Sequence, residues 1–304
     1  MTFLLAALAA ASLLISTRDN LTFVNGNDRK LASAGADAHG YRVLGTVADG
    51  TALVTFNDVG TIVVEAVSPG LGARRVRQFA LGTGGTVARA LDGFLVYDAG
   101  AQLVRRYTAA GETVGSPIAA AGAASEMLGL GSVTAISGGG RLSLYDLRGR
   151  QRKQEIFDAG ALAPVGDDHF AVIDGRDGEV RVYDTNLKRT ATIVPKNHTI
   201  RAIASASDGA LAILTGTPSC TTNDAEVDLY PPDATAPSVV VRPLSAPVSA
   251  LALSNDAIYV GNGRCRGATA PWVSVFARDG KDQSTIGDID TATGIVPFAA
   301  PAAK

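Results

Sequence analysis

The sequence predicts an all-β fold, a seven-bladed β-propeller whose blades are four-stranded antiparallel sheets. Three observations predict it: a strand pattern that recurs about every 42 residues, turns rich in Gly and Asp between the strands, and no stretch with sustained helical periodicity. We assign all 304 residues to this single domain, because folds of this kind routinely run to such a length as one unit.

The clearest part of the repeat is a strand with apolar residues at its first and third positions and an aromatic residue at its fourth. Copies occur at Val180–Tyr183, Leu142–Tyr145, Val227–Tyr230 and Val273–Phe276, with a looser one at Val104–Tyr107. The aromatic positions are 38 to 47 residues apart, and strands ending at Val64 and Val24 extend the series to seven units. This spacing is typical of a four-stranded blade.

Each unit also contains three other predicted strands in a constant order. An Ala-rich innermost strand such as Val248–Ala252 comes first, then an apolar strand such as Phe170–Ile173, and a polar outer strand such as Gln151–Phe157 follows the aromatic one. A β-sandwich seldom repeats one pattern seven times, and the rungs of a β-helix are much shorter than about 42 residues. A propeller is therefore preferred.

The two ends of the sequence leave alternatives open. Residues 1–15 suit a secretory signal or an anchor, because Phe3–Ile15 is apolar, although no Lys or Arg precedes it. Alternatively, Leu4–Ser16 aligns with Val248–Val260 as the first two strands of a blade. Residues 291–304 are predicted to hold a closing strand and a tail, with Gly294–Phe298 competing with Leu4–Ala10 for the innermost position. Pro297 would then need a free edge.

The composition limits the classes of partner. The chain is 46% hydrophobic with a net charge of -2, so it has no general attraction for phosphate backbones, and no nucleic-acid partner is expected. Its densest basic stretch, Arg148–Lys153, is expected on a solvated turn. Two cysteines are too few for a disulfide framework and lack metal-binding spacing.

The strand Val180–Asp184, which reads Val-Arg-Val-Tyr-Asp, resembles the strand that recurs in a broad bacterial propeller group of NHL-repeat, YVTN-type and PQQ-type proteins. The resemblance covers nearly the whole chain and implies the architecture alone. No Gly-His and Trp-Asp pair recurs as in WD-repeat proteins. Trp272 is the only Trp, so the docking pattern of quinoprotein dehydrogenases is absent and no cofactor is expected.

Two neighbouring units are longer than the others, and each insertion carries one cysteine. In a propeller these insertions join the second strand to the third, on the face where partners usually dock. We therefore predict that, in an oxidising compartment, a disulfide between Cys220 and Cys265 stiffens a ridge on that face. The alternative is two unrelated thiols in loops that tolerate them. The predicted partner-contact residues lie in or beside the two insertions: Thr217, Pro218, Asn223, Asn262, Arg264, Arg266 and Trp272.

The enzymatic alternative depends on histidines. His39 and His198 occupy equivalent connections between units and are expected on the docking face, whereas His169 is expected on the opposite one. Together with carboxylates such as Asp37 and Asp208 they would serve a lactonase- or lyase-like propeller. The acids from Asp174 to Glu179 miss the spacing of a calcium loop. Turn formation explains them, and no metal site is predicted.

These observations favour a non-catalytic scaffold that binds another protein or a protein complex through its loops. We expect it to be exported to the periplasm or the extracellular space, or associated with a membrane, and one version of this hypothesis makes it an accessory subunit of a larger membrane complex. The alternative is the propeller enzyme with His39 or His198 near the channel mouth.

Overall fold

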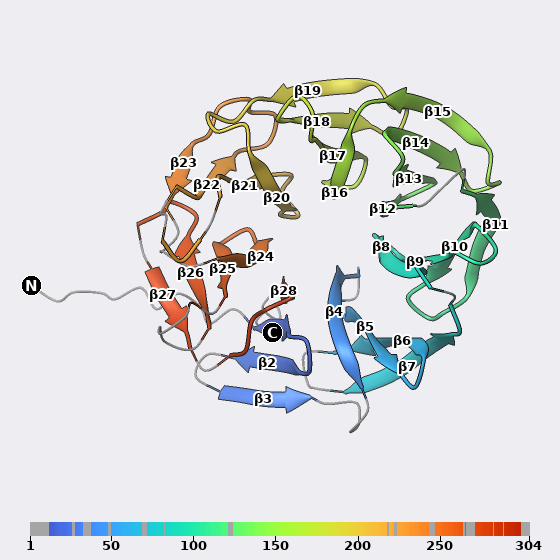
Figure 1. The fold of residues 1–304 in the computed structure, drawn as a ribbon, viewed down its shortest axis with the longest axis horizontal. Coiled ribbons are helices and arrows are strands. Elements are labelled where there is room, and N and C mark those ends of the chain that lie inside the picture. Colours follow the sequence, from blue (N-terminus) through green and yellow to red (C-terminus); the bar gives the residue numbers. More distant parts are fainter. Residues whose placement is uncertain are drawn as a thin grey trace, which may run out of the picture.

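The chain forms a ring of β-sheets around a central channel (Figure 1). The computed structural model describes residues 12–25, 28–32, 38–47, 50–68, 72–81, 83–120, 124–217, 219–221, 224–242, 247–263, 265, 271–281, 283–287 and 289–298. These residues contain 28 strands and no helix. Accordingly, this part of the chain has no helix that could cross a membrane.

Four separate sheets each contain four consecutive strands, ordered from the channel outward. The first holds β4 (His39–Thr46), β5 (Ala52–Asp58), β6 (Thr61–Val67) and β7 (Ala73–Phe79). The second holds β16 (Ala159–Val165), β17 (His169–Asp174), β18 (Glu179–Asp184) and β19 (Arg189–Ile193). The third holds β20 (Ile200–Ser205), β21 (Leu211–Thr215), β22 (Glu226–Tyr230) and β23 (Val239–Val241). The fourth holds β24 (Val248–Leu253), β25 (Ala257–Asn262), β26 (Trp272–Ala277) and β27 (Gln283–Ile286).

A fifth four-stranded sheet closes the ring by joining strands from opposite ends of the described chain. It consists of β28 (Gly294–Pro297), β1 (Leu13–Ser16), β2 (Leu21–Asn25) and β3 (Asp28–Ala32), in this order. β28 pairs antiparallel with β1, Ser16 opposite Gly294 and Leu13 opposite Pro297. Gly294–Pro297 therefore takes the innermost position, Pro297 lies on an edge strand as predicted, and the competing segment Leu4–Ala10 lies outside the described residues.

The remaining eight strands form one continuous sheet, which corrects the predicted count of seven blades. Its order is β11-β10-β9-β8-β12-β13-β14-β15, so the ring has five separate four-stranded blades and one eight-stranded sheet. The strands are β8 (Thr86–Ala90), β9 (Gly93–Asp98), β10 (Leu103–Thr108), β11 (Thr113–Ala119), β12 (Glu126–Leu130), β13 (Val133–Ser137), β14 (Arg141–Asp146) and β15 (Gln151–Ile156).

The two halves of this sheet join where the inner strands β8 and β12 pair in parallel at Ala90 and Gly129. The amide of Leu91 also donates to the carbonyl of Gly129 at 3.0 Å. A Cβ at Gly129 would lie 2.5 Å from the Cβ of Ala90, too close for any other residue. A glycine beside a small residue therefore lets these two strands meet.

The hydrophobic core lies between neighbouring sheets, where the aromatic residues of the repeat are buried. Tyr107, Tyr145, Tyr183, Tyr230 and Phe276 occupy the third strand of their four-strand units and are all buried. These aromatic residues thus belong to the core, as the repeat predicts.

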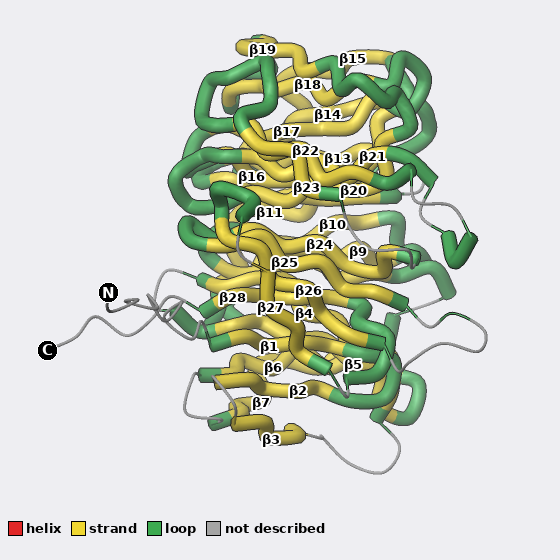
Figure 2. Tube along the Cα trace, turned by 90° about the vertical axis from the view of Figure 1, so that its left-hand side faces the viewer, coloured by secondary structure: helices red, strands yellow, loops and turns green. Residues whose placement is uncertain are grey.

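The connections between strands lie on two opposite faces of the ring, seen edge-on in Figure 2. Because consecutive strands within each four-strand unit are antiparallel, two kinds of connection share one face: those from second to third strand, and those from an outer strand to the next inner strand. We call this the loop face. The opposite face carries the other hairpins.

Candidate functional site

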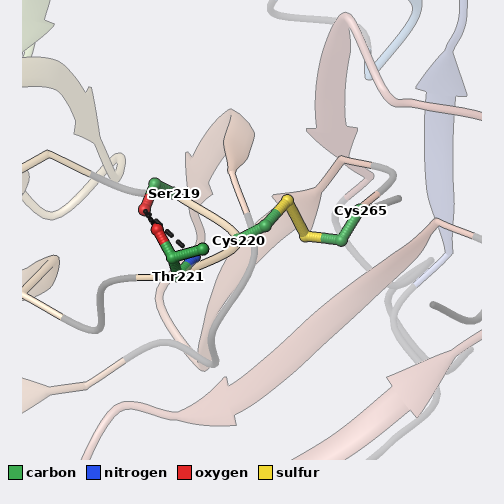
Figure 3. The surroundings of a disulfide bond; sticks show 4 residues. All are labelled: Ser219, Cys220, Thr221 and Cys265. Carbon is green, nitrogen blue, oxygen red and sulfur yellow. Dashed lines mark hydrogen bonds between the residues drawn. A yellow bond between two sulfur atoms is a disulfide. The ribbon is translucent and has the colours of Figure 1, made fainter. Parts of the chain in front are cut away.

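A disulfide between Cys220 and Cys265 joins two neighbouring sheets on the loop face. Cys220 lies between β21 and β22, Cys265 lies between β25 and β26, and their Cα atoms are 5.5 Å apart. The sulfur atoms bridge the two long connections in Figure 3, where the amide of Thr221 also donates to Ser219 Oγ at 3.2 Å. The predicted disulfide is confirmed, and we call Thr217, Ser219–Thr221 and Cys265 the disulfide ridge.

The other predicted contact residues have different environments. Thr217 lies on the ridge and is exposed, whereas Pro218, Asn223, Arg264 and Arg266 lie outside the described residues. Asn262 is fully buried and donates from its amide to Val260 O at 3.0 Å and to Ser274 Oγ at 3.1 Å. Trp272 Nε1 donates to the same Ser274 Oγ at 3.0 Å.

These bonds correct the role predicted for Asn262. A side chain with no exposed surface cannot contact a partner. Asn262 instead stabilises the end of β25 from within the sheet. Trp272, which is partly exposed, is oriented by the same hydroxyl of Ser274. The sequence pattern placed both residues beside the insertions but could not show which one faces the solvent.

The histidines of the enzymatic alternative do not come together. His39 begins β4, and His198 precedes β20 on the far side of the ring (Figure 1). Asp208 is not near His198, because it lies beyond the other end of β20, where Arg278 donates to it at 2.5 Å. Asp37 lies outside the described residues. His169 lies on the opposite face, as predicted, 2.6 Å from Asp168.

Arg181 lies among three carboxylates at the loop-face end of β17 and β18. Its guanidinium group is 2.5 Å from Asp174, 3.1 Å from Asp177 and 2.7 Å from Glu179. The Phe157 ring lies 4.4 Å from the guanidinium carbon. Carboxylate oxygens grouped this closely suit a metal ion, but here a side-chain cation already balances them. Asp174 Oδ1 also accepts the amide of Arg176 at 3.0 Å, in agreement with the turn role predicted for these acids.

The next sheet has a surface hollow on the loop face. Its volume is about 460 Å³. It lies between the connection that precedes β20 and the start of β22, and it is lined by Lys196, Asn197, His198, Thr199, Asp224 and Glu226. The segment between β21 and β22 contributes to both features: it carries Cys220 of the disulfide ridge and then Asp224, which lines the hollow. Sequence analysis singled out only His198 from this set.

Two glycines shape the hollow. Gly178 has a φ of +65°, and a Cβ there would lie 2.6 Å from the carbonyl oxygen of His198. Gly216 has a φ of +89°, a Cβ there would lie 2.3 Å from the carbonyl oxygen of Asp224, and its amide donates to Thr199 O at 2.9 Å. Gly178 therefore packs the preceding sheet closely against the wall at His198, and Gly216 joins the two walls within their own sheet.

Two buried polar atoms near the hollow lack hydrogen-bond partners within the described part of the chain: Asp228 Oδ1 and Thr215 Oγ1. Asp228 is only 3% exposed. Burial, and then the charge of Glu226, raise the pKa of the Asp228 carboxyl. A buried polar atom without a partner is costly. Asp228 occupies the position that Arg181 holds in the preceding copy of the repeat, two residues before the aromatic one. This replacement of a cation by an acid is visible in the sequence and could have drawn attention to this unit.

Comparison with known proteins gives the fold. No family model and no curated protein sequence matches the chain. Among solved structures, KlHsv2 with loop 6CD replaced by a Gly-Ser linker superposes with a TM-score of 0.60 at 11% identity, over 88% of this chain and 89% of that one. The chain has a β-propeller fold.

Two other propellers of known structure are similar to the same extent. U3-55K gives a TM-score of 0.60 at 14% identity over 84% of this chain and 87% of that one. The RRP9 WD40 repeats give a TM-score of 0.58 at 13% identity, over 86% of this chain and 87% of that one. These likenesses support a β-propeller, while the narrower resemblance to the NHL, YVTN and PQQ types is not confirmed by them.

Proposed function

We propose that this propeller is a non-catalytic scaffold that binds another protein or protein complex through its loop face. The observation that carries the proposal is the disulfide ridge, which fixes the two long connections of neighbouring sheets side by side. A surface ordered in advance loses less conformational entropy on binding, and a cross-link between loops provides such order.

The proposal includes a location outside the cytoplasm, in the periplasm or extracellular space or at a membrane, where the chain would serve as an accessory subunit of a larger assembly. The Cys220–Cys265 bond supports the oxidising compartment, because disulfides persist there and are rare in a reducing cytosol. Trapping the thiols in intact cells tests this part: finding both cysteines reduced would contradict it. A need for detergent during extraction would separate the membrane form from the free one.

Photo-crosslinking from single positions tests the binding face. The crosslinker is placed at Val59 or Thr221, both exposed on the loop face, and at Asp167 or Asp256, both exposed on the opposite face. We expect the two loop-face positions to capture the same partner and the two control positions to capture none. Capture from the opposite face alone, or capture from no position with a monomeric protein in native extracts, would refute the proposed function.

A further inference from the structure

Two consecutive sheets have the same strand arrangement but differ at one position of their third strand, where the first carries a cation and the second an acid. In β18, Arg181 lies two residues before Tyr183 and balances Asp174, Asp177 and Glu179. In β22, Asp228 takes the position of Arg181, and Glu226 takes that of Glu179. The second sheet has therefore exchanged its internal cation for another acid.

The two acids of β22 lie on one face of their sheet. Glu226 and Asp228 are alternate residues of the strand, and alternate residues of a strand share a face. Asp224 and Glu226 line the hollow. Asp228, one step further along, is 97% buried on that face, with Oδ1 lacking a hydrogen-bond partner among the described residues. The hollow is lined by Asp224 and Glu226, and Asp228 is the next residue after Glu226 on the same face of β22.

The cations already nearby do not replace Arg181. Arg242 Nε is 3.1 Å from Glu226, but its side chain is 74% exposed, and a pair in water contributes little. Lys196 lines the hollow, yet within the described part of the chain neither Lys196 nor Asp224 forms an ion pair. The Asp228 carboxyl interacts with the Tyr230 hydroxyl, but its Oδ1 has no hydrogen-bond partner among the described residues and is left for a donor from outside.

We propose that this hollow binds an arginine side chain of the partner protein, whose guanidinium group takes the place that Arg181 holds one sheet earlier. The inference rests on the proposed function, because it needs a protein at the loop face. It identifies that partner by its chemistry: an exposed arginine on a surface that reaches the hollow beside the disulfide ridge.

A guanidinium group fits the observations better than a metal ion. Its planar fork carries five donors that can serve several carboxylates at once. Among the described residues, the only three ligand groups that lie within 4.8 Å of one another are those around Arg181, not those of β22. Acceptors spread along a hollow of about 460 Å³ suit a side chain rather than a single ion.

The test is a titration of the isotopically labelled full chain with N-acetyl-arginine-methylamide, followed by the amide NMR signals of residues 196–199 and 224–228. We expect saturable shifts with a Kd of roughly 1 to 10 mM for this single-residue probe. N-acetyl-lysine-methylamide, which lacks the fork, should bind more weakly. Calcium and zinc ions are titrated separately to examine a metal site.

Variants connect the shifts to the acids. Asp224→Asn and Glu226→Gln should each weaken binding about tenfold, while Asp167→Asn, on the opposite face, should leave it unchanged. Asp228→Arg restores the internal cation of the preceding sheet and should abolish binding. Because this buried change can prevent folding, the Asp224→Asn and Glu226→Gln variants are sufficient on their own.

The outcomes separate this inference from the proposed function. Arginine shifts that are lost in Asp224→Asn support the inference. Absence of saturable shifts, equal shifts in the variants, or tighter binding of a metal ion in the same signals would overturn it, even if loop-face crosslinks persist. Loss of those crosslinks would overturn the proposed function whether or not arginine binds.

Discussion

Val59 shows a conflict between a side chain and its backbone. It has a φ of +43° in the turn that joins β5 to β6, is followed by Gly60 at +77°, and is 81% exposed. A β-branched residue is unfavourable in this region, whereas Asn before Gly is the preferred pair in such a hairpin turn. Nothing in the packing of the described residues explains the valine.

Replacing Val59 by Asn should therefore stabilise the protein. We expect Val59→Asn to raise the free energy of unfolding by about 0.5 to 1 kcal/mol, measured by urea denaturation. Val240→Asn is the matched control, since Val240 is also exposed but lies in strand β23, where the same change should be neutral or destabilising. Equal effects at the two positions would disprove the backbone explanation.

Asp228 should make stability depend on pH. Its pKa in the folded chain is raised, first by burial and then by Glu226, so the stabilising neutral form is complete below the unfolded value of about 4. That contribution is lost as the pH rises through the folded pKa. Asp228→Asn should therefore melt higher than the unchanged protein at pH 7.5, with the difference closing toward pH 4. A constant difference across this range would contradict the assignment.

Residue roles were the least predictable part of the site. The spacing of the repeat placed Asn262 beside an insertion, but burial of its amide against Ser274 depends on packing across β25 and β26. Asp208 was a chain neighbour of His198, yet a six-residue strand separates them and carries them to opposite faces. Residues that are close in the sequence can lie on opposite faces of the ring when a strand runs between them.

Among the elements, the two insertions on the loop face were predicted most directly. Each unusually long connection carried one cysteine, and neighbouring sheets place such connections side by side. The removal of both thiols tests what their bond contributes. Cys220 and Cys265 are 45 residues apart, and closing a loop of this size destabilises the unfolded chain by about 4 kcal/mol.

The double variant Cys220→Ser/Cys265→Ser should lose about that amount of unfolding free energy, measured by urea denaturation without reductant. Dithiothreitol should shift the unchanged protein to the same midpoint and leave the double variant unaffected. A reductant effect on the double variant would show that another process is being measured.

The junction between β8 and β12 could not be predicted, because it depends on the fit of one glycine against one alanine. We expect Gly129→Ala to cost about 1 to 3 kcal/mol through overpacking against Ala90. Gly160→Ala is the control: its Cβ would lie 3.5 Å from the Cβ of Ile173, at ordinary contact distance. Thermal unfolding of both variants measures the difference, and equal melting temperatures would contradict the prediction.

At the scale of the whole molecule, the repeat predicted a propeller because every unit needs two neighbours to cover its aromatic strand. It also predicted a closing strand but left two candidates for one place. The blade count was less predictable, because strand spacing does not show whether two inner strands will hydrogen-bond. The sequence shows that Asp228 replaces Arg181 in the next unit, but it could not show the hollow beside β22, where residues 196–199 lie next to Asp224 and Glu226.

The closure of the ring depends on Ser16, which is fully buried. Its hydroxyl lies 3.1 Å from Thr293 Oγ1 and accepts the amide of Val43 at 3.3 Å, so it links three strands. Ser16→Ala should cost about 1 to 3 kcal/mol and increase hydrogen exchange in β1 and β28. Ser137→Ala removes a similar bond to Gly160 O at 3.0 Å, away from the closure. If both variants exchange equally at β28, Ser16 has no special part in closing the ring.

The pairing of β1 with β28 has a consequence for synthesis. The paired residues Ser16 and Gly294 are 278 positions apart, so a growing polypeptide exposes the inner edge of β1 on the ribosome until β28 has been translated. An unpaired strand edge is a template for aggregation. Expression of this protein should therefore be sensitive to chaperone supply and to translational pausing late in the message.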